Sequence, residues 1–192
     1  MEIVDRIFEL ISANLIYCLP AMILTLLTFQ LFFKDKLQFK KAYRIIKWII
    51  IGYAIVNLIY FFIIIIAYPD QSAFLNRATG KYWLNTWIMM FSAVLLPFTL
   101  LYKRIEIKPL YLLFVSIMMK IGWYFERYVI LIASHNSYEY WTETETHWLD
   151  SPWSGFYMTW IQGFILALIL IGLTTIIGRN ERKKTVHNNG YN

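Results

Sequence analysis

Residues 156–178 read FYMTWIQGFILALILIGLTTIIG, a stretch that contains no charged side chain. A helix of about 20 apolar residues crosses the ~30 Å hydrocarbon core of a bilayer. Inside that core only a helix or a closed barrel satisfies every backbone N–H and C=O group. The stretch therefore predicts a transmembrane α-helix.

Four more stretches of this kind precede it. The five predicted spans cover approximately residues 10–33, 48–67, 83–102, 109–133 and 156–178. Composition agrees, since 59% of the residues are hydrophobic and only 16% are charged, against ~25% charged in an average soluble domain. We expect an all-α polytopic membrane protein: a single domain over residues 1–192, five transmembrane helices, a four-helix-bundle type core and a basic tail at 179–192.

The basic residues set the expected orientation. Most of the 18 Lys and Arg residues fall in segments 34–47, 103–108 and 179–184. The positive-inside rule makes that side cytoplasmic, so we expect a bacterial inner-membrane protein with a periplasmic N-terminus and a cytoplasmic C-terminus. Because these basic segments are short and adjoin the membrane, they indicate contact with lipids and no nucleic-acid partner.

The fourth span is unusual because "KIGWYFERYVILIASH" (120–135) carries Lys120, Glu126 and Arg127. A charged residue at the centre of a span is costly and usually faces the bundle interior, where it pairs. Lys120, Tyr124 and Arg127 share a helix face by their spacing, whereas Glu126 is turned about 100° from Arg127. These groups form a proton or quinone site near the outer surface, or Glu126 and Arg127 make polar contacts between helices, or Arg127 extends outward to the membrane surface. Lys120 is expected to be neutral, hydrogen-bonded to a carbonyl, or paired with a carboxylate from another subunit.

Other polar side chains lie at the same depth as this site. In the predicted orientation, the outer halves of the spans include Tyr17, Asn57, Asn85 and Tyr124. Together with Glu126 they are candidates to line a pocket for a quinone head group and to relay its protons.

Other chemistries are disfavoured. The histidines lie at the membrane edge, in the outer loop and in the tail, so no haem is expected in this chain. They also lack the spacing of zinc ligands, so we expect no metal site. Cys18, the only cysteine, is expected to be a small buried residue. A transporter is disfavoured because the sequence indicates neither a discontinuous helix nor an inverted repeat.

Four stretches carry a resemblance to a known family: "IGYAIVN" (51–57), "FLNRATGKYWLNTWIMMFSAVLLPFTLLYKR" (74–104), "FVSIMMKIGWYFERYVILIASH" (114–135) and "DSPWSGFYMTWIQGFILALILIGL" (150–173). In order and spacing they resemble the polysulfide-reductase NrfD-type membrane subunits, most of all the version found in bacterial alternative complex III. The corresponding family segments include an Arg-x-x-Gly-Pro-Tyr loop and an Ile-Gly-Met-Trp-x-Glu-Arg-Phe span followed by a His-containing outer loop.

The resemblance implies a subunit of a quinone-linked respiratory complex, which holds quinone near the periplasmic face and passes electrons to iron–sulfur or haem subunits. Glu126 and Arg127 fall on the family's Glu-Arg pair, His135 on its loop histidine and Arg77 on its loop arginine. Quinone is then the expected cofactor, with none bound covalently. The expected partners are other membrane and periplasmic subunits, which the outer loop 136–153 would contact through aromatic residues that include Trp141 and Trp148.

The chain also departs from the family pattern. It matches only the second of two four-helix bundles, whereas quinone chemistry is placed mainly in the first. Asn57 and Leu58 stand where a carboxylate is expected, the basic loop lacks a histidine, and Lys81 replaces a proline. The alternative is a non-catalytic structural or assembly subunit that kept the NrfD-like fold and lost the quinone chemistry.

The predicted orientation is directly testable. A reporter fused after Asn192 should lie in the cytoplasm, and a reporter inserted near Glu143 should lie outside, because the basic segments are retained on the inner side. Two reporter proteins measure this, one that is active only in the cytoplasm and one that is active only outside it. An external C-terminus would contradict the orientation and the depths derived from it.

Overall fold

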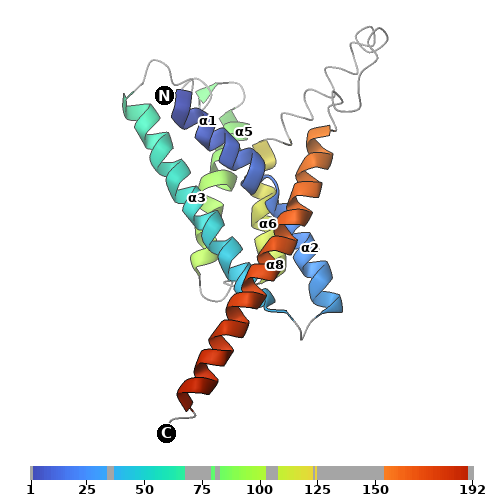
Figure 1. Cartoon of the computed structure of the whole chain (residues 1–192). Coiled ribbons are helices and arrows are strands. Elements are labelled where there is room, and N and C mark those ends of the chain that lie inside the picture. The colour runs from blue at the N-terminus through green and yellow to red at the C-terminus, as the bar shows by residue number, and fades with distance from the viewer. Residues whose placement is uncertain are drawn as a thin grey trace, which may run out of the picture.

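The computed structural model describes residues 2–33, 37–67, 79–80, 83–102, 108–122, 124 and 154–189 (Figure 1). In these residues helices are joined by turns and short loops, and no strand occurs. The elements in chain order are α1 (Glu2–Ile11), η1 (Ser12–Ile16), α2 (Leu19–Phe32), α3 (Phe39–Ala67), α5 (Trp83–Met90), η2 (Phe91–Leu95), η3 (Leu96–Leu101), α6 (Pro109–Met119) and α8 (Ser154–Asn189). The all-α prediction is confirmed for this part of the chain.

Four helical segments are long and apolar enough to cross a membrane: Arg6–Phe32, Phe39–Ile63, Trp83–Leu101 and Gly155–Gly178. They correspond to the first, second, third and fifth predicted spans. The fourth predicted span, 109–133, is described mainly at its start, where α6 is a shorter apolar helix. The total of five membrane crossings and the bundle type therefore stay predictions. The fourth predicted span cannot be followed to its end, because most of residues 123–153 lie outside the described part of the chain.

Two helices extend further than the hydropathy predicts. α3 begins at Phe39, well before the predicted start at residue 48, so Lys40, Lys41 and Arg44 belong to a helix. α8 continues past residue 178 to Asn189, and Figure 1 shows this red end projecting beyond the other helices. Hydropathy marks where a helix can lie in lipid, whereas Lys and Arg continue a helix readily in water.

The first and third spans are interrupted. The first passes from α1 into the π-helical η1, then through a turn at Tyr17 and Cys18 into α2. Pro20 stands in the first turn of α2 and has no N–H to donate to the carbonyl of Ile16. The third passes from α5 through the π-helical η2 into the 3₁₀ helix η3, where Pro97 is in the first turn. The backbone stays in the right-handed helical region through both changes of winding, and each segment still counts as one helix of spanning length. Neither segment is unwound like the discontinuous helices of transporters.

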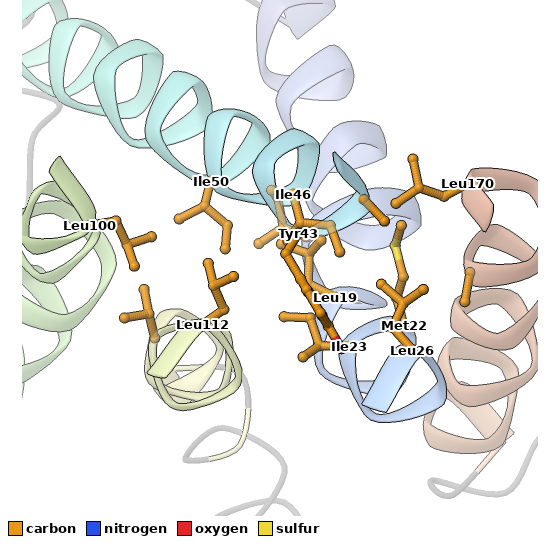
Figure 2. Close-up of a cluster of buried hydrophobic side chains, with 14 of the residues drawn as sticks. Leu19, Met22, Ile23, Leu26, Tyr43, Ile46, Ile50, Leu100, Leu112 and Leu170 are labelled. Atoms are coloured by element: carbon orange, nitrogen blue, oxygen red, sulfur yellow. The ribbon is translucent and has the colours of Figure 1, made fainter. Parts of the chain in front are cut away.

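The apolar core forms where α2 packs against α3, α6 and α8 (Figure 2). Its buried side chains include Leu19, Met22, Ile23 and Leu26 of α2, Tyr43, Ile46 and Ile50 of α3, Leu100 of η3, Leu112 of α6 and Leu170 of α8. The outward faces of α3 and α8 carry exposed apolar side chains such as Phe62 and Ile165. This arrangement suits a bundle in lipid, with α2 at its centre.

α8 approaches the interruption in the first span very closely. A Cβ built on Gly163 would lie 2.6 Å from the Cβ of Ala21 and 2.7 Å from the carbonyl oxygen of Cys18. In membranes, where lipid is as apolar as the side chains, small residues stabilise helix pairs by letting their backbones approach. Gly163 therefore sets the distance between α8 and the start of α2.

We predict that Gly163→Ala lowers the free energy of unfolding by about 1–3 kcal/mol, the usual cost of overpacking, because the added methyl group meets backbone atoms. Thermal unfolding of the detergent-purified protein, followed by circular dichroism, measures this. Gly172→Ala is the matched control, since a Cβ at Gly172 of the same helix has no heavy atom within 4 Å. Equal stability of the two variants would contradict the requirement for close approach.

Candidate functional site

The interruption in the first span exposes a backbone carbonyl to a side chain of α8. In a continuous α-helix the N–H of Cys18 would bond to the carbonyl of Asn14, but here it donates to the carbonyl of Leu15 at 3.2 Å. The Asn14 carbonyl instead accepts from Nε2 of Gln162 at 3.1 Å, and the same Nε2 lies 3.1 Å from Oδ1 of Asn14. α8 thus supplies a donor that the first span lacks at this point.

Lys120 makes the corresponding contact from the fourth predicted span. It follows the last residue of α6, where the backbone leaves α-helical geometry (φ −91°, ψ 1°), and its side chain is only 2% exposed. Nζ donates to the carbonyl of Tyr17 at 3.2 Å. It also lies 5.3 Å from the ring centroid of Tyr17 and 5.2 Å from that of Tyr124, within the ~6 Å range of cation–π attraction. Of the three states that the sequence left open, the structure shows the hydrogen bond to a carbonyl.

A third contact to the interruption comes from α3. The hydroxyl oxygens of Ser12 and Tyr53 lie 2.6 Å apart, and the Ser12 hydroxyl donates to the Phe8 carbonyl at 2.7 Å. Because Ser12 has only one hydroxyl hydrogen, Tyr53 must be the donor to Ser12. Cys18 is fully buried, as predicted for a small residue, and its thiol lies 3.8 Å from the Ala13 carbonyl oxygen.

These contacts all involve the first span between Ser12 and Cys18, and we call their residues together the break site. It consists of Ser12, Asn14, Tyr17, Cys18, Tyr53, Lys120, Tyr124 and Gln162. The first span contributes half of these residues, and three other helical segments contribute the rest. An amine between two phenol rings can hold a proton or attract an anionic oxygen, so the break site is suited to chemistry that moves protons within a membrane.

The structure brings together only part of the predicted site. Tyr17 and Tyr124 meet through Lys120. Asn57 of α3 and Asn85 of α5 are half-buried and take no part in these contacts. The remaining predicted site residues lie outside the described residues: Glu126, Arg127, His135, Arg77, Trp141 and Trp148.

Sequence reasoning missed four members of the site: Ser12, Asn14, Tyr53 and Gln162. Each is a polar residue in an apolar segment, so its presence was visible, but its partner was not. The one local signal was Pro20, because a proline within a span interrupts the backbone hydrogen bonds of the preceding turn. Combining that proline with nearby polar side chains would have predicted a polar centre at this depth.

Comparisons with known proteins add no assignment. Tested against protein-family models, curated proteins and solved structures, the chain matches none. Within the described residues, no three His, Cys, Asp or Glu side chains gather as metal ligands. The NrfD-type resemblance therefore stays a hypothesis based on the sequence stretches quoted above.

The Ser12–Tyr53 contact should be a genuine interhelical bond. Tyr53→Phe removes only the donor, so we expect it to lower the free energy of unfolding by about 0.6 kcal/mol, the average for such bonds in membranes. A double-mutant cycle with Ser12→Ala measures the coupling, and Tyr157→Phe on the exposed face of α8 is the control. Strictly additive effects of the Ser12 and Tyr53 substitutions would contradict a direct bond.

Proposed function

We propose that this chain is an integral membrane subunit of a multi-subunit, quinone-linked electron-transfer complex, and that its break site handles protons of the quinone reaction. The observation that carries the proposal is Lys120, a basic side chain that is 2% exposed among helices apolar enough to cross a membrane. A charged side chain at the centre of a span costs about 2.5–3.5 kcal/mol. A basic group kept at such a position favours a role for its charge or its proton. Its Nζ donates to the Tyr17 carbonyl and lies next to the rings of Tyr17 and Tyr124.

The chemistry that fits this position is proton exchange with a quinol. Oxidation of a quinol to a quinone releases two protons and two electrons, and the electrons pass to an iron–sulfur or haem subunit of the complex. Lys120 exchanges a proton or attracts the developing quinone oxyanion, while the rings of Tyr17 and Tyr124 flank it. Glu126 and Arg127 extend this path toward the outer surface. The remaining groups proposed to contact the quinone are Asn57, Asn85 and His135.

The proposed setting is the bacterial inner membrane, with the N-terminus in the periplasm and the C-terminus in the cytoplasm. Other membrane subunits supply the helices that this chain lacks relative to NrfD-type proteins. A periplasmic subunit contacts the outer loops through Arg77, Trp141 and Trp148. The support for this setting is the distribution of basic residues and the sequence resemblance.

The alternative function is a non-catalytic structural or assembly subunit, and one observation favours it. The side chains of Gln162 and Lys120 both donate to backbone carbonyls of the first span. Such bonds satisfy backbone carbonyls of an interrupted helix whether or not a substrate ever binds there. In that case the break site fixes helix packing, and the complex uses the chain as a scaffold.

The decisive experiment compares turnover with assembly in the complex purified from its native membrane. Lys120→Met keeps a long unbranched side chain but removes the charge and the donor, and Glu126→Gln keeps size and hydrogen bonding but cannot carry a proton. If both residues handle protons, each variant should slow quinol oxidation per assembled complex by about 10²-fold or more. Steady-state assays with a soluble quinol and quantification of the subunits measure both quantities.

Lys108→Met is the control, since Lys108 is exposed at the start of α6 and should have no effect on turnover. Normal turnover of intact Lys120→Met and Glu126→Gln complexes would contradict the proton role. A scaffold predicts a different result: normal turnover per complex, with fewer complexes assembled. A purified assembly without any redox subunit would contradict both the respiratory setting and the quinone chemistry.

A further inference from the structure

One end of the bundle combines basic residues that are far apart in the sequence. α3 begins there, and its first two turns carry Lys40 and Arg44, both exposed to the surroundings. The first turn of α3 contains no acidic residue. The N–H groups of Lys41 and Ala42 bond to the carbonyl of Gln38, which makes Gln38 the residue at which this helix starts.

The end of the last span lies directly against this helix start. A Cβ built on Gly178 would overlap the side-chain amide of Gln38, so α8 and the beginning of α3 are in contact at this point. α8 then continues as a helix through residues 179–189, a segment whose sequence includes Arg179, Arg182, Lys183 and Lys184. Two basic segments, one at the start of α3 and one in the sequence of α8 after Gly178, therefore adjoin a single contact.

The depth of these residues matches the head-group layer of a bilayer. The membrane-crossing part of α8 ends at Gly178, and the next six residues rise about 9 Å along the helix axis. The head-group region on each side of a bilayer is about 5–8 Å thick. By hydropathy, the basic part of α8 thus begins at the depth of the lipid phosphates, and Lys40 and Arg44 lie in the first turns of the apolar α3 segment, which begins at Phe39. The amino end of α3 adds the partial positive charge of its helix dipole.

We propose that the start of α3 and the end of α8 form a binding site for the head group of an anionic phospholipid. Lys40 and Arg44 at the start of α3 contact its phosphate, and the basic sequence of α8 after Gly178 adds positive charge nearby. In the predicted orientation the lipid belongs to the cytoplasmic leaflet, whose anionic lipids attract basic segments next to spans. Depth favours a lipid over an acidic protein segment, because the basic residues begin at the membrane surface. This site is independent of the quinone chemistry at the break site.

Native mass spectrometry of the detergent-purified full chain, titrated with phosphatidylglycerol or phosphatidylcholine, tests the site. The wild-type protein should bind phosphatidylglycerol more tightly, and added salt should weaken the difference. The double variant Lys40→Gln/Arg44→Gln should bind it about 25-fold more weakly, at about fivefold for each charge removed. A second variant, Arg182→Gln/Lys183→Gln/Lys184→Gln, tests the α8 side of the same site.

Arg6→Gln is the matched control. Arg6 is exposed on α1 at the other end of the first span, so its loss should leave phosphatidylglycerol affinity unchanged. Equal binding of the two lipids, or unchanged binding by both multiple variants, would overturn the proposal. An equal loss of phosphatidylglycerol affinity in Arg6→Gln would also overturn the proposal, because the effect would then reflect net charge alone. Loss of an acidic partner protein from the purified complex without loss of lipid affinity would identify the surface as a protein contact and also overturn it.

Discussion

Backbone hydrogen bonding in lipid is the constraint on which the rest of this structure depends. A membrane interior offers no water to an unpaired carbonyl, so each interruption of a helix must be completed by the protein itself. The first span is interrupted between Ser12 and Cys18, and side chains from outside it then donate to its carbonyls. Gln162 reaches Asn14 from α8, and Lys120 reaches Tyr17 from the end of α6. The interruption is therefore the place where polar side chains of neighbouring segments meet the first span, whereas apolar side chains of α2 make most of the packing.

Hydropathy was sufficient to predict the membrane-crossing segments, because the cost of polar groups in lipid depends on composition and length more than on partners. Four of the five predicted spans recur as apolar helices of spanning length. The ends of the helices were less predictable, as α3 and α8 show, since lysine-rich turns can be helical in water. The interruptions were missed for a different reason. An average over about 20 residues does not register one proline, whereas the loss of a single N–H at Pro20 changes the hydrogen bonding of a whole turn.

The sequence could predict some of the residues in the candidate site but not the contacts between them. Tyr17, Tyr124 and Lys120 stood out because they are polar or charged within apolar segments, and the structure brings them together. The acceptor for Lys120 is a backbone carbonyl, a group that every residue has and that no side-chain pattern can mark. Asn57 and Asn85 were grouped with them by depth alone. Depth does not say toward which neighbour a helix face turns, so these two asparagines could not be assigned to the break site from sequence.

The interruptions also bear on the transporter that the sequence disfavoured. In transporters, the carbonyl ends of broken helices commonly coordinate a small cation near the middle of the membrane. Tyr17 follows η1 and Lys120 follows α6, but the backbone at Tyr17 stays right-handed helical and the Lys120 carbonyl accepts from the N–H of Tyr124. Neither residue is therefore the free end of a helix. In this chain the carbonyl of Tyr17 accepts a hydrogen bond from Nζ of Lys120. A tethered amine can exchange a proton but cannot leave its site, whereas an ion in transit must do so. The contact between Lys120 and the first span is thus one that a fixed group makes, and the sequence argument against a transporter stays in place.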